Sequence, residues 1–171
     1  PLFIDKIKSG NPITVTDGSM TRFIMNLDEA VDLVLYAFEH GSQGDLFVQK
    51  SDASTITDLT TAIKELFDVP DYPVETIGIR HGEKMYETLL TNEECARAVD
   101  CGKFYRVIAD NRDLNYEKYI SQGNVRRSEL SEFNSNNTKQ LNVDELKKKL
   151  LTCSLVIEEL KEWKKSRESI G

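Results

Sequence analysis

Short β-prone runs alternate with segments of helical apolar spacing along most of this 171-residue chain, and this order constrains the fold most. Apolar residues that recur at helical spacing favour a helix, and short β-branched or aromatic runs that end in turn residues favour a strand. Strands are expected at residues 13–16, 22–25, 46–49, 74–79 and 104–108. The order of these elements predicts an α/β fold with α+β character and excludes an all-β fold.

The expected helices have recognisable start signals. Asn26 is followed by Glu29 at the spacing of a capping box. Apolar residues follow this box at helical spacing, namely Ala30, Val31, Val34, Leu35 and Phe38, and Gly41 is expected to end the helix. Ser54 and Asn142 are expected to cap later helices, and residues 85–90 are expected to be helical.

Charge and apolar content narrow the class of protein. Lys and Arg total 22 against 29 Asp and Glu, which gives a net charge of −7. Nucleic acids and acidic membranes are bound by clustered positive charge, so neither is an expected partner. The longest apolar stretch is too short to span a bilayer, no secretory signal is visible, and the cysteines lack CxxC spacing. These features predict a cytoplasmic domain.

Several motifs of phosphate, metal and nucleophile chemistry do not occur in the sequence. It contains no GxGxxG, Walker or GxSxG sequence, and His40 and His81 have no neighbouring Cys or His at metal spacing. We therefore expect no catalytic residue, no metal ligand and no bound cofactor in this chain. Because Pro1 opens an apolar helical pattern that is already under way, we also expect the chain to be a fragment.

Two stretches contain residues suited to a nucleoside diphosphate. Arg22 lies at the start of a β-prone run, and its guanidinium could form paired bonds to a phosphate. In residues 75–87, Arg80 is expected at a strand end with Glu83 nearby, a pair that could bind phosphate and the ribose hydroxyls. The residues alone also allow an ordinary β-turn-β unit with a solvated Arg22, and a local surface pair of Arg80 and Glu83.

The same stretches resemble a known family. The matching text is Pro12-Ile-Thr-Val-Thr-Asp17, Met20-Thr-Arg-Phe23, Leu27-Asp-Glu-Ala-Val-Asp-Leu-Val34, Gly44-Asp-Leu-Phe-Val48 and Ile79-Arg-His-Gly-Glu-Lys-Met-Tyr-Glu87. Together these motifs resemble the sugar-nucleotide-binding part of extended short-chain dehydrogenase/reductases of bacterial polysaccharide biosynthesis. They are most similar to the capsule-type inverting UDP-N-acetylglucosamine 4,6-dehydratases. The resemblance implies the short strands and helices of the substrate domain, without the complete Rossmann domain.

This resemblance also implies an activity. In the family, an N-terminal Rossmann half binds NAD or NADP and holds a Tyr-x-x-x-Lys acid/base pair, and no Tyr-x-x-x-Lys occurs here. The implied reaction oxidises C4 of the hexose, eliminates water across C5 and C6, and returns the hydride to C6 with inversion at C5. This chain would then be the substrate-binding half of a lyase and inactive by itself.

The resemblance further implies roles for individual residues. The strand around Val15 would face the uracil. Arg22 and Arg80 would bind the diphosphate, and Glu83 would bind the ribose. A UDP-sugar is therefore the expected ligand, and a homo-oligomer is the expected assembly. A non-catalytic nucleotide-sugar-binding or scaffold module, and a fragment of a UDP-sugar 4-epimerase, remain as alternatives.

We expect the chain to have three segments. Residues 1–109 are expected to form the UDP-sugar-binding domain, residues 110–141 an extended arm, and residues 142–171 the C-terminal helices. The arm shows no sustained periodicity, and its large apolar residues are spread out, namely Leu114, Tyr116, Tyr119 and Phe133. Such a segment is typical of an arm that lies across another surface, with a disordered linker as the alternative.

Overall fold

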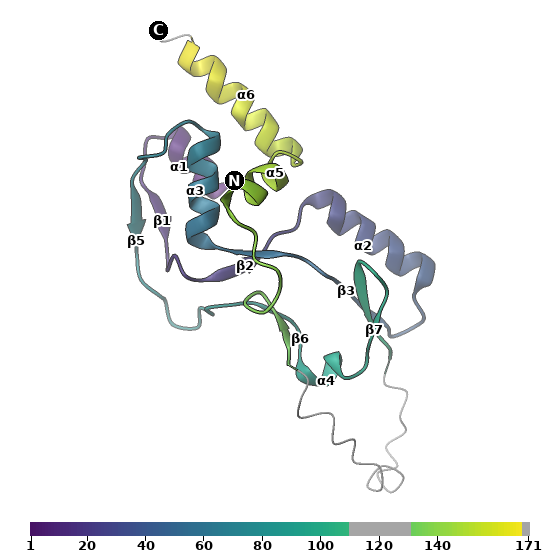
Figure 1. Ribbon diagram of the computed structural model, residues 1–171. Coiled ribbons are helices and arrows are strands. Elements are labelled where there is room, and N and C mark those ends of the chain that lie inside the picture. The colour runs from purple at the N-terminus through teal and green to yellow at the C-terminus, as the bar shows by residue number, and fades with distance from the viewer. Residues whose placement is uncertain (110–130, 169–171) are drawn as a thin grey trace, which may run out of the picture.

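The structure, a computed structural model, describes residues 1–109 and 131–168 (Figure 1). Its helices are α1 (Leu2–Lys8), α2 (Leu27–His40), α3 (Ile56–Leu66), α4 (Asn92–Cys95), α5 (Val143–Leu150) and α6 (Ser154–Glu168). Its strands are β1 (Ile13–Val15), β2 (Thr21–Phe23), β3 (Leu46–Gln49), β4 (Ala53–Thr55), β5 (Val74–Thr76), β6 (Thr88–Leu90), β7 (Ala98–Asp100), β8 (Phe104–Val107) and β9 (Phe133–Asn134). The expected mixture of short strands and helices is therefore confirmed.

The strands of the described residues form small sheets rather than one large one. β1 pairs in parallel with β5, and β2 pairs antiparallel with β4. A three-stranded antiparallel sheet has the order β3-β8-β7, and β6 pairs antiparallel with β9. The segment that leaves β5 contacts both β1 and β2, because the Ile77 N–H donates to the Val15 carbonyl and the Met85 carbonyl accepts the Thr21 N–H.

The main hydrophobic core lies between α1, β1, α3 and α6. Its buried members are Ile4, Ile7, Ile13, Val15, Ile63, Phe67, Val156 and Leu160. The indole N–H of Trp163 donates to the Phe67 carbonyl at 2.8 Å, and Lys8 Nζ lies 2.9 Å from Glu162 Oε2. These contacts attach α6, the last helix, to the first and third helices.

A second core lies between α3 and α5. Ala62, Leu141 and Leu146 are buried there, with Ala62 and Leu146 fully inaccessible. Lys147 Nζ on α5 also contacts Glu65 Oε2 on α3 at 2.6 Å. Because both the main core and this second core use α3, this helix is covered on two sides.

Three expected elements differ from the structure. The strand expected at residues 74–79 ends at Thr76, and the helix expected at residues 85–90 is absent, since residues 88–90 form strand β6. A segment of six residues is too short to nucleate a stable helix, whereas pairing with β9 satisfies the backbone of β6. Thr55 instead of Ser54 caps α3, because its side chain accepts the Asp58 N–H at 3.0 Å.

Helix α2 forms where it was expected, but its apolar stripe does not reach the core. The Asn26 side chain accepts the Glu29 N–H at 2.8 Å, and Glu29 accepts the Asn26 N–H at 2.9 Å, so the capping box is confirmed. No residue of α2 is buried. Its apolar stripe therefore faces away from the core, since Phe38 is 83% exposed and Val34 is 52% exposed.

The C-terminal part of the expected arm is folded onto the rest of the chain. β9 pairs with β6, and Leu141 is buried with its N–H donating to the Ala53 carbonyl at 2.7 Å. Residues 110–130, which include Leu114, Tyr116 and Tyr119, lie outside the described residues. Among the described helices, none is long and apolar enough to cross a membrane.

Candidate functional site

The residues between β5 and β6 form the site loop, residues 77–87, which is attached to β1 at one end and to β2 at the other. The Ile77 N–H donates to the Val15 carbonyl at 2.8 Å. Near the other end, the Thr21 N–H donates to the Met85 carbonyl at 2.9 Å. The site loop therefore spans the gap between the ends of two strands, and Arg80 and Glu83 lie in its middle.

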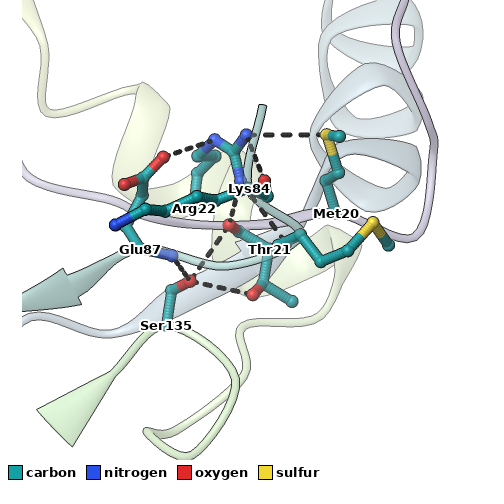
Figure 2. A network of polar contacts seen from close by, with 7 residues as sticks. Met20, Thr21, Arg22, Lys84, Glu87 and Ser135 are labelled. Atoms are coloured by element: carbon teal, nitrogen blue, oxygen red, sulfur yellow. Dashed lines mark hydrogen bonds and ion pairs between the residues drawn. The ribbon is translucent and has the colours of Figure 1, made fainter. Parts of the chain in front are cut away.

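The Arg22 side chain fixes the second attachment point (Figure 2). Its guanidinium donates to the Thr21 carbonyl at 2.7 Å and to the Lys84 carbonyl at 3.0 Å. Charged donors form stronger hydrogen bonds than neutral ones, so this pair holds the site loop firmly against β2. The Arg22 side chain remains 30% exposed, so part of it faces solvent.

The remaining contacts of Arg22 are longer. Its guanidinium lies 3.4 Å from the Met85 carbonyl and 3.5 Å from Met20 Sδ, and its Nε lies 3.5 Å from Glu87 Oε1. Figure 2 shows the guanidinium between Glu87 and Met20. Hydrogen bonds weaken as they lengthen, so an incoming phosphate could replace these contacts without releasing the shorter ones.

Ser135 completes the network beneath Arg22 and is fully buried. Its hydroxyl donates to the Thr21 carbonyl at 3.0 Å and accepts the Glu87 N–H at 2.9 Å. The Thr21 hydroxyl lies 2.8 Å from it and must be the donor in that pair, because the Ser135 proton is already used. The Ser135 N–H also donates to the Glu87 carbonyl at 2.8 Å. One hydroxyl thus joins β2, the site loop and the segment after β9.

Arg80 and Glu83 face each other across a tight turn. The Glu83 carboxylate accepts the Arg80 N–H at 2.8 Å, and the Glu83 N–H donates to the Arg80 carbonyl at 3.1 Å. Gly78 and Gly82 flank Arg80 with φ of +80° and +87°, a backbone region that favours glycine. Both charged side chains are exposed, so their polar ends are accessible to a ligand.

The structure brings the four expected site residues onto the site loop and its two attachment points, but not into one cluster. Val15 is only 6% exposed and its side chain belongs to the main core, so its side chain does not reach the surface. Arg80 lies at a turn rather than at the strand end expected for it. Within the described ranges, no hydrogen bond or ion pair links Arg22 to Arg80 or Glu83.

Sequence reasoning missed Glu87 and Ser135 as members of this network. Glu87 closes the matching text at residues 79–87, and Ser135 lies in the Asn-rich text after Phe133. Thr21 and Ser135 are 114 residues apart in the chain, so no local pattern could show their contact. A buried serine inside a polar stretch has no periodic signal of its own.

An apolar cavity of about 420 Å³ lies elsewhere, beside α1. Its lining includes Leu2, Phe23, Leu59, Leu150 and Val156. Arg22, Arg80 and Glu83 are not among its lining residues. Because it lacks convergent polar groups, this cavity does not suit a nucleoside diphosphate.

The starts of α2, α3, α4 and α5 do not fit a dinucleotide cradle. Such a cradle uses free N–H groups at a helix N-terminus behind a glycine-rich turn. Here the side chains of Asn26, Thr55, Thr91 and Asn142 occupy the starts of α2, α3, α4 and α5. Among the described residues, no group of three or more His, Cys, Asp or Glu is placed to hold a metal ion.

Two family profiles match the chain. The profile described as polysaccharide biosynthesis protein matches residues 1–109, and the one described as polysaccharide biosynthesis protein C-terminal matches residues 110–156. The first match covers more than half of the 171 residues. The chain therefore belongs to this family of polysaccharide biosynthesis proteins.

Individual relatives carry a more specific name. The proteins named UDP-glucose 4-epimerase from Rickettsia akari (strain Hartford) and Rickettsia prowazekii (strain Madrid E) are 53% identical over 161 residues, which is 94% of this chain and 47% of theirs. The X-ray structure of Pen from Bacillus thuringiensis is similar with a TM-score of 0.72 and 29% identity, over 89% of this chain and 44% of that one. This chain thus spans about half the length of the curated relatives it matches.

Proposed function

We propose that this chain is the UDP-sugar-binding half of a UDP-sugar 4-epimerase that acts in polysaccharide biosynthesis. The observation that carries this proposal is the 53% identity, over 94% of the chain, to proteins named UDP-glucose 4-epimerase. It replaces the dehydratase as the first candidate, because the names of these relatives support the epimerase. The attached site loop supports a binding role, since it presents charged groups on a fixed backbone.

In the proposed complex, the site loop binds the nucleotide. Arg80 contacts the diphosphate and Glu83 accepts the ribose hydroxyls, because both side chains are exposed on a turn held by its own hydrogen bonds. Arg22 binds the diphosphate by exchanging its longer contacts for phosphate oxygens. Val15 contributes through the backbone of its strand rather than through its buried side chain.

Local donors must supply the affinity for the diphosphate. The net charge of −7 repels an anionic ligand at long range, so the gain comes from contacts with individual cations. A charge-assisted hydrogen bond is worth about 1.5–3 kcal/mol. Loss of one arginine contact should therefore weaken binding roughly tenfold to a hundredfold.

The proposed chemistry is shared with residues outside this chain. NAD or NADP, which supplies reversible hydride transfer when bound, would be held by the half of the enzyme that this chain does not contain. We assign no catalytic residue to this chain.

A 5-inverting UDP-N-acetylglucosamine 4,6-dehydratase is the second candidate. The observation that favours it is the text at residues 79–87, which resembles the capsule-type dehydratases. Both candidates begin with oxidation at C4 and bind the same UDP group. They differ in the next step, because only the dehydratase loses water across C5 and C6.

Product analysis of the complete protein that contains this chain tests the proposal. The purified protein is supplied with NAD or NADP and either UDP-glucose or UDP-N-acetylglucosamine, and the products are identified by NMR. The expected product is the C4 epimer with no change in mass. A 4-keto-6-deoxy product would identify the dehydratase, and UDP binding without turnover would indicate a scaffold module. An absence of UDP binding would overturn the proposal altogether.

A further inference from the structure

Ser135 lies in a turn that begins at the end of β9, residues 134–140, and this turn is held by its own side chains. The Asn134 side chain accepts the Asn137 N–H at 3.0 Å, and the Asn137 side chain accepts the Asn134 N–H at 2.9 Å. The Gln140 side chain donates to the Ser135 carbonyl at 2.8 Å. Contacts inside the turn therefore fix the position of Ser135 without any help from the site loop.

The 134–140 turn is also attached to the strand that carries β2. The Ala53 N–H donates to the Lys139 carbonyl at 2.9 Å, and the Leu141 N–H donates to the Ala53 carbonyl at 2.7 Å. Ala53 belongs to β4, which pairs antiparallel with β2. The turn and β2 are thus both held by β4, so their relative position does not depend on the site loop.

The Ser135 hydroxyl replaces a backbone carbonyl just beyond the paired residues of β6 and β9. The Ser135 N–H donates to the Glu87 carbonyl at 2.8 Å, but the Glu87 N–H donates to the Ser135 hydroxyl at 2.9 Å, since Gln140 already binds the Ser135 carbonyl. The same hydroxyl donates to the Thr21 carbonyl at 3.0 Å. A carbonyl can only accept, so this place needs a group that accepts one hydrogen bond and donates another.

These bonds reach the two residues between which the Arg22 guanidinium lies. The Thr21 carbonyl accepts both the Ser135 hydroxyl and the Arg22 guanidinium, the latter at 2.7 Å. The Glu87 carboxylate lies 3.5 Å from Arg22 Nε, and the backbone of Glu87 is bound by Ser135. Figure 2 shows the Ser135 hydroxyl joined to Thr21 and Glu87 beneath Arg22. A shift of Ser135 would therefore move groups on two sides of the guanidinium.

We propose that Ser135 is a positioning residue for the diphosphate, which acts by orienting Arg22. A side chain that is oriented before its ligand arrives loses less conformational freedom on binding, and this increases affinity. Ser135 itself is fully buried, so it acts through Arg22 and not by contact with the ligand. The inference rests on the proposed function, because it takes Arg22 as a ligand of the diphosphate.

The position of Ser135 in the sequence gives this role a wider meaning. Arg22, Arg80 and Glu83 lie within residues 1–109, which match the first family profile, whereas Ser135 lies within residues 110–156, which match the C-terminal profile. The C-terminal segment therefore contributes to the nucleotide site from below, although none of the residues expected to contact the nucleotide belongs to it.

Calorimetric titration of the complete protein with UDP tests the positioning role. Ser135→Ala should weaken binding about threefold to tenfold, as expected for the loss of hydrogen bonds that orient one ligand group. Ser135→Cys should give an intermediate affinity, because a thiol is a weaker donor and acceptor. Ile63→Ala is the control, since Ile63 is buried in the main core and should bind UDP like the wild type despite a larger loss of stability.

Two further measurements separate positioning from a purely structural role. In an Arg22→Ala background, Ser135→Ala should cause no further loss of UDP affinity, because the residue through which it acts is gone. With the UDP-sugar as substrate, Ser135→Ala should raise KM by the same factor as it weakens UDP binding. Its kcat should stay within about twofold of the wild type, since only binding is affected.

Three results would overturn the positioning role of Ser135 alone. The first is wild-type UDP affinity in Ser135→Ala, or in Ser135→Cys if the alanine variant does not fold. The second is an equal loss of affinity in Ile63→Ala, and the third is a full further loss from Ser135→Ala in the Arg22→Ala background. A wild-type protein that does not bind UDP would instead contradict the proposed function, and the positioning role with it.

Discussion

Helices α2 and α3 have similar sequence signals but opposite surroundings. Each begins with a capping side chain that accepts a backbone N–H. This side chain is Asn26 in α2 and Thr55 in α3. α3 buries Thr60, Ala62 and Ile63 between two cores, whereas α2 buries no residue. Both helices therefore have an apolar face, but only the apolar face of α3 is covered by other described residues.

This difference separates what stabilises the chain from what the chain presents to other molecules. α3 packs against α5, and with α1, β1 and α6 it builds the main core. α2 packs only its inner side and ends near β3, away from that core, as Figure 1 shows. Substitutions in α3 should therefore change the stability of the isolated chain. Substitutions of the exposed apolar residues of α2 should not, namely Leu27, Val31, Val34, Leu35 and Phe38.

The largest expected effect comes from a matched truncation in the two helices. Ile63→Ala should destabilise the isolated chain by about 2–4 kcal/mol, because Ile63 is 7% exposed and its loss leaves a cavity. Val34→Ala should change the unfolding free energy by less than about 0.5 kcal/mol, because Val34 is 52% exposed. Urea unfolding measures both changes in unfolding free energy. Equal changes would contradict the claim that α3 stabilises the chain and the exposed face of α2 does not.

Ser135→Ala should be the next most destabilising change. It leaves the Glu87 N–H and the Thr21 hydroxyl without their buried acceptor, at a cost of about 1–3 kcal/mol. Ser9→Ala is the control, since that hydroxyl is exposed, donating to the Lys6 carbonyl at 3.2 Å and accepting the Asn11 side-chain N–H at 3.0 Å. Thermal unfolding of both variants should show a clear loss for Ser135→Ala only. Two equal melting curves would mean that the network does not hold the site loop.

Removal of the caps of α2 and α3 should lower stability by a smaller amount, and differently in the two helices. Removal of a capping side chain costs about 1 kcal/mol. Thr55→Ala should lower the midpoint of global unfolding, because α3 belongs to the core. Asn26→Ala should mainly increase amide exchange within α2 and shift the midpoint less. Circular dichroism and hydrogen exchange distinguish the two, and a larger midpoint shift for Asn26→Ala would contradict this account.

Acid should weaken the attachment of the loop between α2 and β3, residues 41–45, to β8. The Ser42 N–H, with further help from the Ala109 N–H and the Arg106 guanidinium, holds the pKa of Asp45 below its ordinary value of 3.8. A lowered pKa in the folded state means that Asp45 stabilises the fold above pH 3.8 and that this contribution is lost as the pH falls. Unfolding at pH 6 and at pH 3 should therefore differ less in Asp45→Asn than in the wild type. An unchanged difference would assign the acid sensitivity to other carboxylates.

Local patterns predicted most of the elements and their starts. The capping boxes at Asn26 and Asn142 lie where the sequence placed them, because a cap depends on residues within one turn. β6 was missed because its partner β9 lies more than 40 residues later in the chain. The exposure of the apolar stripe on α2 could not be predicted for a similar reason, since periodicity shows that a face is apolar but not what covers it.

The residues of the candidate site remain a prediction, and their arrangement could not be predicted from the sequence. Arg22, Arg80 and Glu83 are exposed or half-exposed at the site loop and its attachment to β2, as a binding role requires. The sequence could not show that Arg22 holds the Lys84 carbonyl, nor that Ser135 supports it from 114 residues away. Contacts of this kind depend on the tertiary fold, which no local spacing encodes.

Calorimetric titration of the complete protein with UDP tests the central claim, that the site loop binds the nucleotide of a UDP-sugar. Arg80→Ala should weaken binding roughly tenfold to a hundredfold. Glu83→Gln should be milder, because an amide oxygen still accepts a ribose hydroxyl. Lys161→Ala, which removes an exposed cation from α6, should bind UDP like the wild type. Unchanged affinity in Arg80→Ala, with melting curves equal to the wild type, would contradict the account.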